Sequence, residues 1–357
     1  MSRSLRILIL TPTAFPFETG NASTVERWRR SLAKQGHDVQ VLATEHSDIV
    51  QLKKKLSNFR PEMIHLHHAY RTGVLFLKLK KEWEKNRWGL VVSPGGTDLY
   101  LDINTKDRHR IITQIFEIAN AMIAQSEEMR QRITDSYQGL KHKIFMIPKS
   151  FAWMGDEEFD LRKVSNCGME NILFFFPGGI RPVKGNLEAL KLLQKVYTLR
   201  PVIRVVFAGP PLDQDYAVRF EKEINGLQHF ARWLPSVPFQ AMRSAYQGAD
   251  VVLNFSSSEG ISNVLLEAKA SGKPILASDI PGNHSLVSGD EQASPAGLLF
   301  DLHSQEHFIE QALRLIDDEE LRKRLGQEGK TQADQLPGPD EEALGLLRVY
   351  EKVLKEP

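Results

Sequence analysis

The chain of 357 residues is 41% apolar and 25% charged. Because it is longer than the ~250–300 residues at which single hydrophobic cores stop growing, we expect two domains. A formal net charge of +1 argues against binding to nucleic acid, and the single cysteine, Cys167, excludes an internal disulfide bond. Apolar runs such as residues 5–10 are too short to span a bilayer or to form the core of a signal peptide, which predicts a cytoplasmic protein.

The first half of the chain alternates short apolar runs with segments of helical period. The runs are residues 5–10, 39–43, 63–66, 90–93, 121–125 and 144–147. Between them, segments such as residues 23–35 and 72–85 carry apolar side chains at three- and four-residue spacing. Alternation of strands and helices predicts a parallel, doubly wound sheet.

Residues 151–170 are polar and acidic with no clear period, and we interpret them as a linker. The alternation then resumes, with apolar runs at residues 171–176, 202–208, 250–254, 274–277 and 297–300. The predicted fold class is therefore α/β, with two Rossmann-like domains, residues 1–165 and 166–338. We expect a cleft between the domains, with ligands beyond the carboxyl ends of the strands.

The last stretch of the chain, residues 341–354, is amphipathic. A helix there places Leu344, Leu347, Tyr350 and Leu354 on one stripe.

A candidate binding site follows the strand predicted at residues 250–254. A glycine after Glu259 permits a tight turn at the start of a helix. Amides at a helix N-terminus, together with the helix dipole, favour a diphosphate group. The amides in question belong to Gly260, Ile261, Ser262 and Asn263.

Glu267 lies eight residues beyond Glu259, about 12 Å away if all of that segment is helical. That separation suits a nucleotide-sugar, with one carboxylate near the sugar and the other near the ribose. Taken alone, the stretch is explained equally well as a capped helix with a solvated glutamate.

A glycine-rich loop, residues 178–185, follows the first strand of the second domain. Gly179 lets a ligand approach the backbone, and Arg181 and Lys184 offer positive charge. Cations held there stabilise the negative charge that builds on a departing diphosphate. Alone, the loop is explained by a surface turn with two solvated cations. Together with the two glutamates it favours a donor site.

These motifs resemble the family-4 retaining glycosyltransferases of the GT-B fold. The resemblance rests on Glu259 and Glu267, on residues 268–282 after them, and on the loop with Lys184. It extends into the first half through residues 36–39 and 64–67, so it covers nearly the whole chain.

The resemblance implies a nucleotide-sugar donor, with a UDP-sugar favoured, and neither a metal nor another cofactor. It places Glu259 on the donor sugar, Glu267 on the ribose, and Arg181 and Lys184 on the diphosphate. It also implies that a C-terminal helix, residues 339–357, crosses back to the first domain.

The chain departs from the family pattern in both halves. The family's usual arginine directly after the loop glycine is replaced by Gly179, and Arg181 stands two residues later. A histidine that many members carry in a first-domain loop corresponds here to Gly95. Thr97 and Asp98, just beyond it, are candidates for the acceptor side, and a turn-forming role for Asp98 is an equal alternative.

Near the first helix, the family's usual pair of glycines is altered to Gly20 and Asn21. We expect Gly20 to contact the diphosphate, and Asn21 and His67 to lie on the acceptor side.

The departures are similar to a subgroup that contains selenosugar synthases and "glycosyltransferase 1 domain-containing" proteins. The acceptor is unknown from the sequence. The alternatives to ordinary glycosyl transfer are a synthase that joins a sugar to selenophosphate or thiophosphate, a nucleotide-sugar epimerase, and a non-catalytic sugar-nucleotide binding protein.

Two further patterns carry weaker alternatives. A metal site at Asp213 and Asp215 is disfavoured because the GT-B cleft that the resemblance implies holds its diphosphate with amides and cations. A metal site at His65, His67 and His68 is disfavoured because no cysteine or carboxylate accompanies them at ligand spacing. Residues 72–88 are apolar on one stripe and basic elsewhere, which would suit peripheral contact with an anionic membrane. A helix packed on its own sheet is the favoured interpretation.

Overall fold

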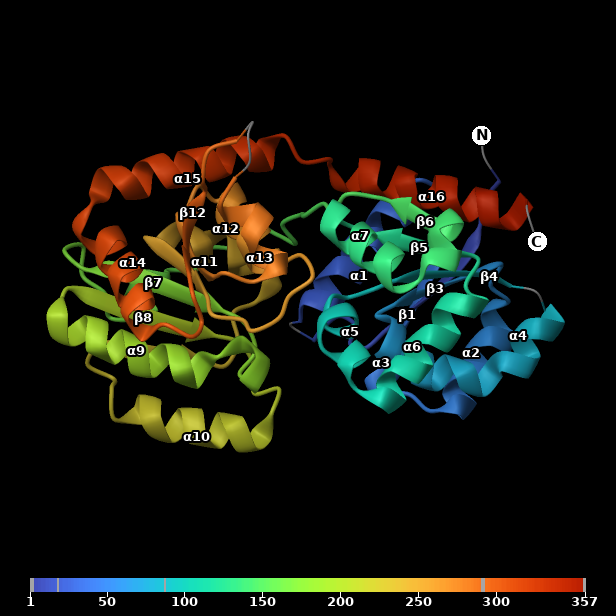
Figure 1. The fold of residues 1–357 in the computed structure, drawn as a ribbon, viewed down its shortest axis with the longest axis horizontal. Coiled ribbons are helices and arrows are strands. Elements are labelled where there is room, and N and C mark those ends of the chain that lie inside the picture. The colour runs from blue at the N-terminus through green and yellow to red at the C-terminus, as the bar shows by residue number, and fades with distance from the viewer. Residues whose placement is uncertain (1–2, 18, 87, 290–292, 356–357) are drawn as a thin grey trace. The chain divides into compact units, whose positions relative to one another are not determined.

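Two six-stranded parallel sheets organise the residues that the structure, a computed structural model, describes: 3–17, 19–86, 88–289 and 293–355 (Figure 1). Each sheet belongs to one of two units. Unit 1 comprises Met1–Ala152 and Pro337–Pro357, and unit 2 comprises Trp153–Leu336. The predicted fold class, α/β with two Rossmann-like sheets, is confirmed.

The sheet of unit 1 has the strand order β2-β1-β3-β4-β5-β6. Its strands are β1 (Arg6–Thr11), β2 (Asp38–Ala43), β3 (Met63–His67), β4 (Gly89–Ser93), β5 (Ala121–Ala124) and β6 (Ile144–Met146). From β1 the chain moves outward to β2 and returns to pair β3 on the other side of β1. Ligands in such sheets bind beyond the carboxyl ends of the strands at this reversal.

Helices cover both faces of this sheet, because side chains alternate along each strand. On β1, Ile7 and Ile9 pack with helices α1 and α16, whereas Leu8 and Leu10 pack with α2, α3 and α6. The helices of unit 1 are α1 (Gly20–Lys34), α2 (Ile49–Phe59), α3 (Ala69–Phe76), α4 (Lys80–Asn86), α5 (Thr97–Tyr100), α6 (Lys106–Ile118), α7 (Glu127–Ser136) and α16 (Pro339–Lys355).

The predicted C-terminal helix is α16, and it completes the core of unit 1. Leu346, Tyr350 and Val353 are buried there against β1, β3 and α1. The predicted apolar stripe is wrong in one respect, since Leu344 is 48% exposed. The buried stripe is centred two residues further along the chain, on Leu346.

The sheet of unit 2 has the order β12-β11-β10-β7-β8-β9, with the reversal between β7 and β10. Its strands are β7 (Ile172–Pro177), β8 (Ile203–Ala208), β9 (Ala231–Leu234), β10 (Val251–Asn254), β11 (Ile275–Ser278) and β12 (Gly297–Phe300). Sequence patterns anticipated all of these except β9, which contains only four residues, one of them an arginine. A short strand at the edge of a sheet gives little alternating signal.

Helices lie on both faces of this sheet as well (Figure 1). Phe174 and Phe176 pack toward α9, α10 and α14, and Phe175 between them packs toward α11, α12 and α13. The helices of unit 2 are α8 (Leu161–Val164), α9 (Asn186–Leu199), α10 (Gln214–Asn225), α11 (Met242–Gly248), α12 (Asn263–Ala270), α13 (Pro281–Val287), α14 (Gln305–Asp317) and α15 (Glu319–Asp334).

The boundary between the units lies at Ala152, earlier than the predicted boundary at residue 165. The stretch interpreted as a linker contains α8, whose Leu161 is buried in the core of unit 2. Arg162 fastens the same segment, since its guanidinium donates 2.8 Å to the carbonyl of Gly168 and pairs with Asp250. Packing of this kind has no periodic signature in an irregular segment.

The basic segment at residues 72–88 packs on its own sheet, which is the interpretation that we favoured over contact with a membrane. Leu75 and Leu79 are buried, and Trp83 and Trp88 pack against the same core, while Arg87 lies outside the described residues. Among the helices that the structure describes, none is long and apolar enough to cross a membrane.

Candidate functional site

Two loops of unit 2 meet at the reversal of strand order between β7 and β10. One is the glycine-rich loop after β7, which ends in the 3₁₀ turn Pro182–Lys184, and the other follows β10. The amide of Ser257 donates 2.9 Å to the carbonyl of Val183 and joins them. Gly185 adopts φ +64°, and a Cβ there would lie 2.7 Å from the carbonyl oxygen of Phe255. Only glycine allows this approach.

The predicted cation and carboxylate of the site form an ion pair. Nζ of Lys184 donates to Oε1 of Glu259, and the two side chains are 13% and 15% exposed. The hydroxyl of Ser256 donates 2.8 Å to the same carboxylate oxygen. Two residues that lie 75 positions apart in the sequence therefore meet because β7 and β10 are neighbours.

Glu259 is ionised despite its burial. Burial alone would raise the pKa of its carboxyl group. The charge and hydrogen bond of Lys184, the hydrogen bond from Ser256 and the charge of Arg181 outweigh that effect and hold the pKa below its ordinary value. The carboxylate is therefore an acceptor for hydroxyl groups. The charge of Arg181 thus acts on the same carboxylate, and its predicted contact with a diphosphate stays a prediction.

The N-terminus of α12 carries no side-chain cap. Ser262 is the N-cap residue, but its hydroxyl accepts a 3.1 Å hydrogen bond from Asn254. Gly260 and Ile261 precede this cap and Asn263 begins the helix. Helix N-termini attract anions because their amide groups lack intrahelical partners.

A buried polar network that the sequence did not reveal supports the loop after β10. Asn254, Ser256, Ser278 and Asn283 are all 2% exposed or less. Ser278 donates 2.6 Å to the carbonyl of Ser256, and Asn283 donates to the carbonyl of Ser278 at 3.1 Å. Residues of this type in a strand–loop segment are common, so nothing in the sequence marked them.

The helix α13 also approaches this loop closely. A Cβ on Gly282 would lie 2.3 Å from the carbonyl oxygens of both Glu259 and Gly260. The absence of a side chain at this position therefore lets α13 pack directly on the backbone that carries Glu259.

Glu267 lies on α12, one helical turn or more beyond the cap. Its Oε2 accepts a 2.8 Å hydrogen bond from the phenol of Tyr246 on α11. Burial and the charge of Glu267 raise the pKa of Tyr246 well above its ordinary value, so the phenol remains a donor. The sequence did not single out Tyr246.

Gly179 is explained by packing. A Cβ at this position would lie 2.4 Å from Cδ1 of Leu212 and 3.3 Å from the carbonyl oxygen of Pro210. The loop after β8 thus occupies the space that a side chain at residue 179 would need. Arg181 stands two residues later, where the backbone is extended.

Residues 232–235 form the end of β9 and its continuation. The indole of Trp233 donates 3.0 Å to the carbonyl of Gly209. Asp213, one of the two aspartates considered as metal ligands, caps α10, because its carboxylate accepts a 2.9 Å hydrogen bond from the amide of Tyr216. Among the described residues, no group of three or more His, Cys, Asp or Glu side chains could hold a metal ion.

The remaining predicted residues lie in unit 1, at the carboxyl ends of β1, β3 and β4. Gly20 and Asn21 begin α1, which Thr19 caps by accepting from the amide of Ala22 at 3.2 Å. His67 ends β3 and is 3% exposed, with its ring edge-on to Trp28 at 5.1 Å. Burial and nearby cationic groups hold the pKa of His67 well below its usual range, so its imidazole is neutral.

Thr97 and Asp98 organise the loop after β4. Asp98 is fully buried, and its two oxygens accept from the amides of Ala69, Gly95 and Gly96 at 2.7, 3.2 and 2.9 Å. The hydroxyl of Thr97 lies 2.9 Å from Nε2 of His68. These contacts give Asp98 the turn-forming role, and an acceptor contact by either residue stays a prediction.

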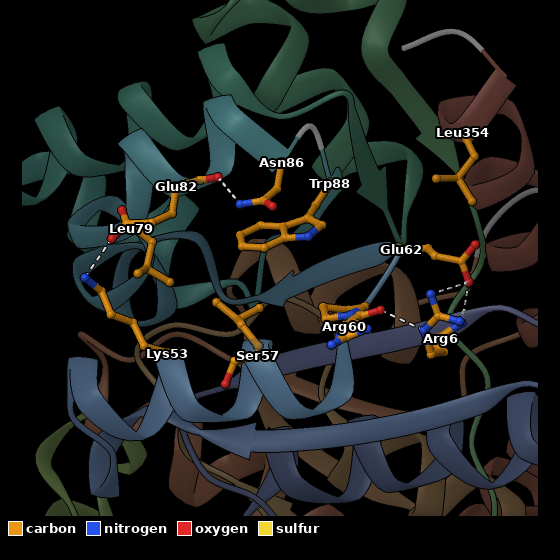
Figure 2. A pocket seen from close by; sticks show the side chains of 12 residues that line it. Arg6, Lys53, Ser57, Arg60, Glu62, Leu79, Glu82, Asn86, Trp88 and Leu354 are labelled. Atoms are coloured by element: carbon orange, nitrogen blue, oxygen red, sulfur yellow. Dashed lines mark hydrogen bonds and ion pairs between the residues drawn. The ribbon is translucent and has the colours of Figure 1, made fainter.

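A pocket of about 770 Å³ lies at the opposite edge of this sheet. Its lining includes Arg6 at the start of β1, Glu62 before β3 and Trp88 before β4, all at amino ends of strands. Figure 2 shows Trp88 in the middle, with cations on both sides. Arg6 pairs with Glu62, and Lys53 pairs with Glu82 at 2.6 Å. The pocket therefore lies at the opposite end of the strands from the predicted site residues, and its charged side chains pair with one another. We do not assign it to the candidate site.

Comparisons with known proteins agree with this geometry. Residues 157–332 match the family model for glycosyl transferases group 1. A glycosyltransferase 1 domain-containing protein 1 from Xenopus tropicalis is 24% identical over 321 residues, which cover 86% of this chain and 87% of the relative. A D-inositol 3-phosphate glycosyltransferase from Corynebacterium glutamicum is 30% identical over 158 residues, which cover 43% of this chain and 37% of the relative.

Solved structures share the fold over nearly the whole chain. A sucrose-phosphate synthase from Thermosynechococcus elongatus superposes with a TM-score of 0.79 at 16% identity, covering 98% of this chain and 99% of that one. HepE from Anabaena, in complex with UDP-glucose, superposes with a TM-score of 0.75 at 16% identity, covering 99% of each chain. The protein thus has the two-sheet architecture of the GT-B fold. Residues 157–332 match the glycosyl transferases group 1 family, and the chain as a whole shares its fold with the solved structures.

Proposed function

We propose that the protein is a retaining glycosyltransferase that takes its sugar from a nucleotide-diphosphate donor, with UDP as the favoured nucleotide. The observation that carries this proposal is the pairing of Lys184 with Glu259 at the strand reversal of unit 2, beside the uncapped N-terminus of α12. A cation, a carboxylate and the backbone amides of a helix N-terminus are the groups that a diphosphate-linked sugar requires. The solved HepE complexes with UDP-glucose, and with UDP and glucose, support the choice of nucleotide.

Each residue has a distinct part in the proposed site. Lys184 and Arg181 neutralise the diphosphate, together with amides at the N-terminus of α12, from Gly260 to Asn263. The Glu259 carboxylate accepts hydrogen bonds from hydroxyls of the donor sugar, and Glu267 accepts from the ribose. On donor binding, Lys184 exchanges part of its contact with Glu259 for a phosphate oxygen.

The proposed reaction breaks the bond between the anomeric carbon and the phosphate oxygen. The bonding electrons leave with the nucleoside diphosphate, whose growing charge Lys184 and Arg181 stabilise. The acceptor attacks the same face of the sugar and passes its proton to the departing phosphate. The described residues of unit 2 offer no convincing enzymic nucleophile, so same-face displacement is favoured over two inversions. We place the acceptor side in unit 1, near Asn21 and His67.

The first test is thermal unfolding of the wild type and of Glu267→Ala with UDP, GDP, ADP and CDP. A ligand at a hundred times its Kd stabilises by about 2.7 kcal/mol, which shifts the midpoint clearly. We expect UDP to shift the wild type and to shift the variant much less. If no nucleotide shifts the wild type, the donor-site proposal is wrong.

Retention is tested separately on turnover products. Proton NMR of the product from an α-linked UDP-sugar should show an α-linked anomeric proton, and a β-linked product would refute same-face displacement. The acceptor screen includes sugars, inositol phosphates, selenophosphate and thiophosphate, so that nucleotide release dependent on one of the last two would favour the seleno- or thiosugar synthase. Conversion of the donor without any acceptor would instead identify an epimerase.

A further inference from the structure

A buried hydroxyl from outside both site loops reaches the proposed ribose carboxylate. Tyr246 on α11 is fully buried, and its phenol donates 2.8 Å to Oε2 of Glu267. The partner carboxylate is only partly buried and lies on α12. One end of this hydrogen bond is therefore fixed in the core, and the other end lies where a ligand can reach it.

The ring of Tyr246 is held by the core of unit 2. It packs edge-on against Phe175 of β7, with ring centroids 5.2 Å apart, and at a tilt against Trp153, with ring centroids 5.8 Å apart. Since β7 also leads into the loop with Lys184, the phenol is set by the same strand that sets the diphosphate cation. The packed ring therefore fixes the position of the phenol oxygen, unlike that of a flexible surface donor.

The hydrogen bond determines how Glu267 is presented. A free glutamate samples several rotamers, and a charge-assisted bond from a hydroxyl to a carboxylate selects one of them. In the selected rotamer, the carboxylate of Glu267 presents its acceptor oxygens to the vicinal hydroxyls of a ribose. Small errors in such placement weaken a contact substantially.

We propose that Tyr246 is a positioning residue that orients Glu267 toward the donor ribose and thereby makes the site selective for ribonucleotides over nucleotides that lack the ribose hydroxyls. The inference rests on the proposed function, because it needs Glu267 to meet a ribose. It adds a determinant of substrate choice that never touches the substrate. Tyr246 remains protonated because burial and the charge of Glu267 raise its pKa well above the ordinary value, so the orientation persists throughout the neutral pH range.

The test is a two-by-two comparison of protein and ligand. Wild type and Tyr246→Phe are titrated by calorimetry with UDP and with 2′,3′-dideoxy-UDP. We expect the wild type to prefer UDP by at least tenfold. In Tyr246→Phe, UDP binding should weaken until the preference falls at least threefold, while binding of the dideoxy analogue changes less than twofold. A purely structural role for the phenol would weaken both ligands alike and leave the ratio unchanged.

Tyr216→Phe is the matched control. Its phenol is also buried and donates 2.6 Å to a glutamate, Glu188, in the same unit but near the start of α9. This variant should keep the full preference for UDP. If it lost the preference as well, general loosening of unit 2 would explain the result and the inference would be overturned.

The two possible failures are distinct. A wild type that binds UDP and its dideoxy analogue equally removes the ribose role of Glu267, and both the proposed site and this inference fall. A wild type that discriminates, with full discrimination kept in Tyr246→Phe, overturns the positioning role alone. If Tyr246→Phe does not fold, 3-fluorotyrosine at position 246 keeps the hydroxyl and makes it a stronger donor. The preference for UDP should then rise, and an unchanged preference counts against the inference.

Discussion

Arg27 of α1 and Glu342 of α16 form a doubly hydrogen-bonded ion pair inside unit 1. The distances are 2.8 Å from Nε to Oε2 and 3.1 Å from Nη2 to Oε1, and the side chains are 3% and 1% exposed. The pair joins a helix near the start of the chain to one near its end. Because both charges are removed from water, each depends on the other for compensation.

Glu342→Ala should therefore destabilise unit 1 by about 3–5 kcal/mol, since it strands a buried guanidinium. The measurement is urea unfolding followed by a signal from unit 1, with Trp28 fluorescence as one choice. The matched control is Lys34→Ala, which removes the exposed pair between Lys34 and Asp340 on the same two helices. The control should leave the midpoint nearly unchanged. Equal effects of the two substitutions would contradict the importance given to burial.

Lys184→Ala and Glu259→Ala should each lower kcat at least tenfold, or about 1.4 kcal/mol in activation free energy. The reason is that Lys184 meets the charge that develops on the leaving diphosphate and Glu259 holds the sugar. Steady-state kinetics with the donor identified by thermal unfolding provide the measurement. Lys191→Ala, on the exposed side of α9, serves as the control with unchanged kcat. Full activity in both site variants would defeat the assignment.

Loss of Lys184 should also change how stability depends on pH. The folded-state pKa of Glu259 lies below its ordinary value, so its ionisation contributes stability above about pH 4.3, which is lost as pH falls through the lowered pKa. In Lys184→Met burial acts without its main compensation, so the pKa of Glu259 should rise. The variant should therefore be most destabilised relative to wild type at neutral pH, and the gap should narrow as Glu259 becomes protonated on acidification.

Urea unfolding at pH 7, 6, 5 and 4 measures this gap. The double variant Lys184→Met with Glu259→Gln is the control, because it carries no carboxyl group to titrate at this position. A gap between Lys184→Met and wild type that stays constant from pH 7 to pH 4 would show that Glu259 does not respond to its cation.

Gly282→Ala should impair donor binding although alanine is the better helix former by about 1 kcal/mol. The added methyl group would lie 2.3 Å from two carbonyl oxygens of the loop that carries Glu259, so the loop must move. We expect at least tenfold weaker binding of UDP by calorimetry. Gly338→Ala, where an added Cβ meets nothing within 4 Å, should bind UDP normally. Normal binding of UDP by Gly282→Ala would mean that α13 can shift without moving the loop that carries Glu259, and the prediction would be wrong.

Chelation should leave activity unchanged, because the proposed site neutralises the diphosphate with Lys184, Arg181 and amide groups. The measurement is the initial rate after dialysis against EDTA, compared with the rate after Mn²⁺ or Mg²⁺ is restored. A rate that falls on chelation and recovers with metal would refute the proposed metal-independent mechanism.

The sequence predicted those parts of the fold that have a period. The runs at residues 171–176 and 202–208 became β7 and β8 nearly to the residue, because buried parallel strands are continuous and apolar. The structure of residues 153–164 was not predicted from the sequence, which indicated only a linker there. Their packing depends on single contacts, such as that of Leu161 with the core of unit 2.

Individual residues of the candidate site could be predicted from the sequence, but the contacts between them could not. Glu259 and Lys184 stood out because charged residues beside glycines follow buried strands. Their contact required knowledge that β7 and β10 are neighbours, which strand order alone supplies. Nothing in the sequence marked Tyr246, because its role depends on a hydrogen bond to Glu267, which the fold brings close to it on α12.

Unit 1 is discontinuous, and this has a consequence for synthesis of the protein. Leu346, Tyr350 and Val353 of α16 belong to a core whose other members come mainly from the first 150 residues. During translation, the early part of unit 1 therefore lacks α16, and one face of its sheet is covered by α1 alone, while all of unit 2 is made. Unit 2 is continuous and has every residue of its core before α16 emerges. The unit that starts first is expected to finish last, and its exposed apolar face is where a chaperone would have reason to bind during translation.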